Sequence, residues 1–132
     1  MFKAASENID VSRPLDQVRD HFANFLRSLP SYERGEKYEV RMPRTDVFIE
    51  EGTKIAGHRI AMHYELSALG DDSTRITVSL AISQSLAFGN PRQRNELVRG
   101  FADTVINAEW VDDLTKYIDS LEKRETEVSV DV

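Results

Sequence analysis

The chain has 132 residues, of which 40% are hydrophobic and 30% charged, with a formal net charge of −6 and no cysteine. This length predicts a single globular domain with one core. The missing cysteines exclude disulfides, thiolate chemistry and cysteine-ligated metal centres, and they favour a reducing compartment. The acidic charge disfavours binding to the phosphate backbone of a nucleic acid.

The two ends of the chain show no targeting pattern. Residues 1–8 lack the apolar stretch of a signal peptide. No stretch approaches the roughly 18 apolar residues that span a bilayer, so we expect a cytoplasmic protein without a membrane span. We predict that residues 1–124 form the domain. Residues 125–132 alternate polar residues with valines, which predicts a frayed tail, with a short added strand as the alternative.

The chain begins with a predicted strand and a predicted helix. Residues 2–11 have strand character, because Ile9 and Val11 place their side chains on one face. Pro14 suits the first turn of a helix, where its missing N–H needs no partner, and Pro30 ends that helix. Apolar residues at three- and four-residue spacing predict one amphipathic face: Leu15, Val18, Phe22, Phe25, Leu26 and Leu29.

The middle of the chain predicts short strands. Residues 38–42 alternate apolar and charged side chains, which predicts a half-exposed strand closed by Pro43. Residues 46–56 are predicted to form a hairpin with a tight turn at Glu51-Gly52. The apolar residues of the first strand are Tyr38, Val40 and Met42, and those of the hairpin include Phe48 and Ile55, which would lie opposite each other.

Two later strands carry their apolar residues at even positions. Residues paired across an antiparallel ladder share a face, so even positions must pair with even positions. The loop must therefore hold an odd number of residues, either 70–72 or 70–74. Upstream, the apolar positions change from odd at Ile55 to even at Ile60. An extra residue would reconcile them, which predicts a β-bulge or bend near Gly57 that would curve the sheet. The even residues are Ile60, Met62, Tyr64 and Leu66, then Ile76, Val78, Leu80 and Ile82.

A long helix is predicted near the C-terminus. Asn90 suits an N-cap, Pro91 the first helical position, and Gln93 the third residue after the cap. Without a proline before Arg124, the helix would have about 33 residues and measure roughly 50 Å, so it must bend near Gly100 or project at one end. Its apolar stripe consists of Leu97, Phe101, Val105, Ala108, Val111, Leu114, Ile118 and Leu121.

This order of elements resembles the helix-grip fold of the START-like, polyketide cyclase/dehydrase superfamily, often called SRPBCC. Residues 9–18, IDVSRPLDQV, look like the family's first strand running into a helix that begins at a proline. Residues 64–66 and 70–78, YEL and GDDSTRITV, look like its late hairpin. The resemblance implies an α+β domain in which a curved antiparallel sheet wraps around a long C-terminal helix, with a short helix after the first strand.

The resemblance also implies a cavity between the sheet and the C-terminal helix that holds a small hydrophobic ligand, of the lipid, quinone or aromatic polyketide class. We expect no cofactor. A polyketide cyclase- or dehydratase-like enzyme is an alternative. A further alternative is a protein-interaction module with a filled cavity, of the co-chaperone or ribosome-associated type. The residues predicted to line the cavity are His58, Met62, Tyr64, Phe101, Val105 and Ala108.

Polar groups that face inward would choose between these functions. Tyr64 and His58 are predicted to hydrogen-bond the polar end of a ligand, and they are the candidates for acid–base catalysis. The alternative is that Tyr64 is an ordinary core tyrosine and His58 a surface histidine. Met62, Phe101 and the other apolar candidates are equally compatible with an ordinary core.

Three arginines cluster in the first turns of the predicted C-terminal helix, where the helix dipole already contributes positive potential. Arg92, Arg94 and Arg99 are therefore candidate anion contacts, for a phosphate or carboxylate headgroup or for an acidic protein partner. The alternative is that they pair with Glu96 or with other nearby acids.

The remaining chemistry-bearing residues predict no further site. His21, His58 and His63 lack the spacing of metal ligands, so we expect no metal. Glu50 and Glu51 are adjacent, but successive residues of a strand face opposite ways, so they are not predicted to act as a carboxylate pair.

Overall fold

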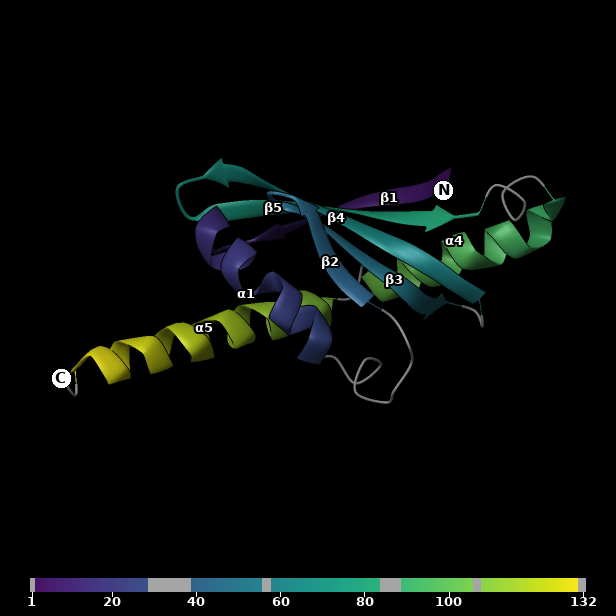
Figure 1. Cartoon of the computed structure of the whole chain (residues 1–132). Helices are drawn as coiled ribbons and strands as arrows, with labels where there is room; N and C mark the ends of the chain where they lie inside the picture. Colours follow the sequence, from purple (N-terminus) through teal and green to yellow (C-terminus); the bar gives the residue numbers. More distant parts are fainter. Residues whose placement is uncertain (1, 29–38, 56–57, 84–88, 106–107, 131–132) are drawn as a thin grey trace.

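The structure, a computed structural model, is an antiparallel sheet with helices on one side (Figure 1). It describes residues 2–28, 39–55, 58–83, 89–105 and 108–130. The strands of the sheet lie in the order β1-β5-β4-β3-β2. The architecture is α+β, which confirms the predicted fold class. The elements are β1 (Phe2–Val11), α1 (Leu15–Ser28), β2 (Glu39–Arg44), β3 (Val47–Ile55), β4 (His58–Gly70), β5 (Ser73–Ile82), α4 (Pro91–Val105) and α5 (Ala108–Val130).

The first strand and helix form where they were predicted. The Val18 N–H donates to the Pro14 carbonyl at 3.1 Å and closes the first turn of α1. The hydroxyl of Thr74 donates to the Arg13 carbonyl at 2.8 Å, which ties the junction between β1 and α1 to β5. The predicted helix end at residues 29–30 lies outside the described residues. The buried residues of α1 are Val18, His21, Phe22, Phe25 and Leu26.

The segment predicted to turn at Glu51-Gly52 is one strand, so that prediction is wrong. β3 runs through both residues. The hairpin forms earlier, between β2 and β3, where Arg44 pairs with Val47. Asp46 in this hairpin has a φ of 64°, a left-handed conformation that aspartate tolerates better than most residues.

An extra residue of the kind predicted near Gly57 lies in β3. The register between β3 and β4 shifts between Glu51 and Thr53, which places the irregularity at Gly52. Gly57 itself lies outside the described residues. A glycine in a strand interior often marks such a bulge, because its backbone is unrestricted. A register shift that accounts for the parity change therefore lies at Gly52, and the predicted position near Gly57 is outside the described residues.

The pairing of β4 with β5 follows the predicted parity. A two-residue turn joins Gly70 to Ser73, and the register shifts between Ala68 and Gly70. Leu69, at this shift, is 47% exposed. The loop was predicted to hold an odd number of residues. Instead, the turn holds two residues, and the bulged residue Leu69 adds the third residue that lets even positions pair with even positions. The confirmed pairs include Met62–Leu80, Tyr64–Val78 and Leu66–Ile76.

β2 is an edge strand, and its alternation stops early. Val40 is buried, but Met42, predicted on the same face, is 53% exposed. The register of β2 against β3 shifts between Arg41 and Arg44, which removes Met42 from the regular alternation. Pro43 lies within β2 instead of closing it. An edge strand tolerates proline, because the missing N–H can lie on the side that has no neighbouring strand.

The predicted C-terminal helix is described as two helices, and the two residues between them, 106–107, lie outside the described residues. α4 has 15 residues and ends at Val105, and α5 has 23 residues and begins at Ala108. α4 runs through Gly100 without interruption. α5 continues to Val130 and projects beyond the sheet (Figure 1), so residues 125–130 extend a helix where a frayed tail was predicted. None of the described helices is long and apolar enough to cross a bilayer.

Asn90 caps α4 as predicted. The Gln93 N–H donates to the Asn90 side-chain oxygen at 3.2 Å. The Arg94 N–H donates to the Asn90 carbonyl at 3.1 Å, which is the first intrahelical bond. The cap satisfies a backbone donor that has no partner within the helix.

Replacing Asn90 with alanine is expected to lower the free energy of unfolding by about 1 kcal/mol, because the Gln93 N–H loses its side-chain acceptor. Asn90→Asp keeps an acceptor and adds negative charge at the positive end of the helix, so it is expected to retain the stability. Urea unfolding of the three proteins measures both effects. Equal losses in the two variants would contradict the capping role.

An aromatic cluster joins α1 to the sheet and to α5. The ring of Phe22 lies 5.0 Å from that of Phe48 and 5.1 Å from that of Tyr64, measured between centroids. On the other side, the Phe22 ring lies 6.2 Å from that of Trp110. Phe25 extends the cluster with an edge-on contact to Trp110 at 5.4 Å. Phe22 therefore lies at the centre of the contact between the sheet and the helices.

Candidate functional site

The helix-facing side of the sheet is apolar and buried. The even positions of β4 and β5 share this side, because they pair directly across the ladder. They belong to one core cluster with residues of all three described helices. The members of that cluster from the sheet centre and from α4 and α5 include Ile60, Met62, Tyr64, Leu66, Leu97, Phe101, Leu114 and Ile118.

Three of the six predicted lining residues come together in this cluster. Met62, Tyr64 and Phe101 are all buried, although the first two lie on β4 and the third on α4. The side chains of the other three, His58, Val105 and Ala108, lie outside the described part of the chain. Their backbones lie at the start of β4, the end of α4 and the start of α5. Ligand binding by these residues stays a prediction.

A carboxylate and a phenol meet on this apolar side. The Tyr64 hydroxyl donates to the Glu50 Oε1 atom at 3.2 Å. Glu50 is only 5% exposed and Tyr64 only 4%. Burying a carboxylate away from water is costly unless hydrogen bonds compensate. Glu50 and Tyr64, hereafter the acid–phenol pair, therefore form a polar point within a mainly apolar interior.

Sequence reasoning missed Glu50 as a site residue. It separated Glu50 from Glu51 correctly: the Glu51 carboxylate accepts a hydrogen bond from the Arg41 guanidinium at 2.6 Å on the opposite side of β3. The turn predicted at Glu51 concealed the inward position of Glu50. Strand alternation could have found it, because Phe48, two residues earlier, is a natural inward residue.

His63 lies on the other side of β4, opposite Ile49 of β3. Desolvation lowers the pKa of its imidazole below the ordinary value of 6.5, and the positive charges of Lys3 and Arg41 lower it further. The Glu51 carboxylate acts in the opposite direction without cancelling these effects. The fold therefore disfavours protonated His63.

Replacing His63 with glutamine is expected to change how stability depends on pH. The unfolded chain takes up the proton near the ordinary pKa, and the folded chain takes it up only at lower pH. The wild type therefore loses stability as the pH falls below about 6.5. Urea unfolding at pH 8 and pH 5 should show a smaller loss for His63→Gln. An identical loss in both proteins would contradict the pKa shift.

The other histidine with a described side chain is structural. His21 Nε2 on α1 lies 3.0 Å from Glu122 Oε1 on α5, which joins the two helices. Among the described residues, no group of three or more histidine, aspartate or glutamate side chains could hold a metal ion.

The three arginines predicted to contact an anion lie on α4. The Arg92 side chain is 92% exposed, and its Nε atom lies 4.0 Å from the Glu96 Oε1 atom, the pairing that was the alternative interpretation. Arg94 is half-buried and Arg99 exposed. No acidic residue lies in the first turn of α4. Anion binding at this helix end stays a prediction.

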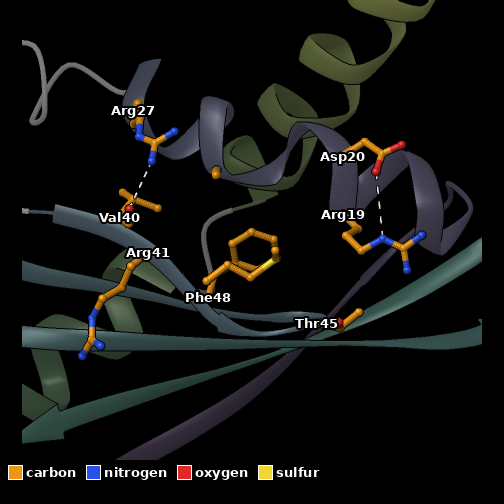
Figure 2. A pocket seen from close by; sticks show the side chains of 9 residues that line it. Arg19, Asp20, Arg27, Val40, Arg41, Thr45 and Phe48 are labelled. Carbon is orange, nitrogen blue, oxygen red and sulfur yellow. Dashed lines mark hydrogen bonds and ion pairs between the residues drawn. The ribbon is translucent and has the colours of Figure 1, made fainter.

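A groove lies between α1 and the β2–β3 hairpin (Figure 2). Its volume is about 500 Å³. It combines apolar and charged side chains, and of the predicted interior residues with described side chains, Met62, Tyr64 and Phe101, none lines it. The residues that line it are Arg19, Asp20, Ala23, Arg27, Val40, Arg41, Met42, Thr45 and Phe48.

Comparison with known proteins gives structural matches alone. No protein-family model matches the sequence, and no curated protein sequence matches it. A START superfamily protein from Mycobacterium smegmatis superposes with a TM-score of 0.56 at 14% identity, over 89% of this chain and 97% of the other. A solution structure from Thermobifida fusca gives a TM-score of 0.52 at 11% identity, over 89% and 93%.

A third solved structure is the Zhui aromatase/cyclase from Streptomyces sp. R1128, with a TM-score of 0.45 at 14% identity, over 91% of this chain and 93% of that one. Sequence identities this low show a shared fold and leave activity open. The sheet and helices described above therefore have the START-like fold that the resemblance of residues 9–18, 64–66 and 70–78 predicted.

Proposed function

Because the chain has a START-like fold, we propose that it binds a small hydrophobic molecule between the sheet and the C-terminal helices α4 and α5. The ligand belongs to the lipid, quinone or aromatic polyketide class. Met62, Tyr64 and Phe101 form the described part of the site, and His58, Val105 and Ala108 complete it.

The acid–phenol pair carries this proposal. A core that served packing alone would gain nothing from a buried carboxylate, because an apolar residue of similar size fills the space without a desolvation cost. A ligand-binding interior needs a few polar groups to orient an otherwise apolar molecule. Glu50 and Tyr64 supply an acceptor and a hydroxyl at one point of the helix-facing side.

The neighbours of the pair define what the site can bind. Met62 is flexible and polarisable, so it adapts to ligands of different shape. The ring of Phe22 lies beside that of Tyr64 and that of Phe48 lies beside Phe22, and aromatic rings favour flat ligands through offset or edge-on contacts. The site therefore suits an apolar or aromatic molecule with one hydroxyl or carbonyl group.

An enzyme of the cyclase or dehydratase type is the second candidate. The observation that favours it is the same hydrogen bond, because a carboxylate and a phenol within reach of each other can share a proton with a bound substrate. An enzyme would convert its bound ligand into a product, whereas a carrier would release the ligand unchanged.

Native mass spectrometry of the protein purified from its own host tests the proposed function. A retained hydrophobic ligand is the expected result. Thermal shift with fatty acids, quinones and aromatic polyketides then assigns the class, since a ligand at 100 times its dissociation constant adds about 2.7 kcal/mol of stability. No retained ligand and no shift with any compound would contradict the proposal and favour an interaction module with a filled interior.

A further inference from the structure

We propose that the groove between α1 and the β2–β3 hairpin is a second binding site, and that it binds a small amphipathic carboxylate. The site goes beyond the proposed function, because it lies at the β2 edge of the sheet and its lining does not include Met62, Tyr64 or Phe101, although it shares Phe48 with the surroundings of the acid–phenol pair. Its volume of about 500 Å³ falls within the range of roughly 300–1,000 Å³ that is usual for small-molecule sites.

The floor of the groove is apolar. Val40 and Phe48 are buried beneath it, and Ala23 of α1 forms part of its wall. Met42 also lines the groove and is 53% exposed, one of two large hydrophobic side chains that the described residues leave exposed. A ligand that covered Met42 would remove this apolar surface from water, which favours binding of an apolar body.

The rim of the groove is positively charged, with three arginines against one aspartate. Two of these arginines already have acidic partners. Arg41 donates to the Glu51 carboxylate at 2.6 Å and points away from Phe48 (Figure 2). Arg19 lies 3.3 Å from the Asp46 carboxylate and 3.9 Å from that of Asp20.

Arg27 differs from the other two. Its guanidinium donates to the Val40 carbonyl at 3.1 Å and to the Asn24 side-chain oxygen at 3.5 Å, both of which are neutral. Within the described ranges, no carboxylate contacts it. A guanidinium has five N–H donors in a planar fork that matches a carboxylate in two-point contact.

The position of Arg27 fixes the chemistry of the ligand. The Val40 carbonyl holds the guanidinium over β2, and the Val40 side chain forms part of the apolar floor. The cation and the apolar floor therefore lie close together in the groove (Figure 2). One cation without a charged partner among the described residues, beside an apolar surface, matches a monoanion with a hydrophobic body. The carboxylate would bind Arg27, and the apolar body would lie over Val40, Phe48 and Met42.

Titration calorimetry with decanoate and decan-1-ol at pH 8 tests this site, because the two probes share a chain and differ in charge. The wild type is expected to bind decanoate more tightly than the alcohol. Arg27→Gln is expected to weaken decanoate binding by about tenfold or more and alcohol binding by less than about twofold. Arg75→Gln, which removes an arginine of β5 that does not line the groove, is the matched control and should leave both unchanged.

Met42→Glu provides a second test that does not depend on Arg27. The position is exposed, so the variant should fold, and the new carboxylate should repel decanoate and weaken its binding by about tenfold or more. If decanoate does not bind, or if neither variant weakens it, the groove is not a carboxylate site. Weakening by Tyr64→Phe instead of Arg27→Gln would place decanoate in the interior, which contradicts the groove and supports the proposed function.

Discussion

Phe22→Ala is expected to lower the free energy of unfolding by about 3–5 kcal/mol, a large part of the roughly 5–15 kcal/mol that stabilises a domain. Phe22 is fully buried, and its ring contacts those of Phe48, Tyr64 and Trp110. Alanine would leave a cavity where α1, the sheet and α5 meet, and backbone elements on three sides limit how far it can collapse.

Urea unfolding followed by circular dichroism measures this loss, and the fluorescence of Trp110 reports on the same contact. Phe22→Leu is the matched control, since it keeps most of the apolar volume and should lose clearly less stability than alanine. If alanine at this position costs less than about 1 kcal/mol, the ring does not lie at the centre of the core. If the alanine variant does not fold, Phe22→Leu keeps the test measurable.

The second large effect concerns the acid–phenol pair. Tyr64→Phe is expected to lower the free energy of unfolding by about 1–3 kcal/mol, because the buried Glu50 carboxylate loses a hydrogen-bond donor. Replacing both residues, with Glu50→Met and Tyr64→Phe together, should cost less than the sum of the two single changes, because no polar atom of the pair then stays buried without its partner.

A double-mutant cycle measured by urea unfolding gives the coupling between the two side chains. The same four proteins, tested for ligand retention by native mass spectrometry, separate stability from binding. We expect the double variant to regain stability while retaining less ligand than the wild type. Additive losses in stability would show that Glu50 and Tyr64 do not interact in solution.

Much of the fold could be predicted because it depends on periodic patterns. The even apolar positions of β4 and β5 determine their pairing, and Asn90 determines the start of α4. Gly52 was assigned to a turn because glycine suits turns and bulges equally, and the choice depends on pairing with β4, which no local pattern contains.

The candidate site was predicted only in part for a related reason. Tyr64 and Met62 follow from alternation along one strand. Glu50 depends on whether β3 continues past it, which is a question of long-range pairing. The groove depends on still more: Arg27 and Val40 belong to different elements and meet only when α1 packs over β2.

The pairing of β1 with β5 has a consequence for how the chain folds during its synthesis. Val11 pairs with Thr74 and Phe2 with Ile82, so the first strand made is completed by the last strand of the sheet. Such pairing between distant segments slows folding, because a long loop must close before any contact stabilises it. β1 therefore leaves the ribosome long before its partner exists, and until β5 is made its unpaired edge is free to pair with other chains.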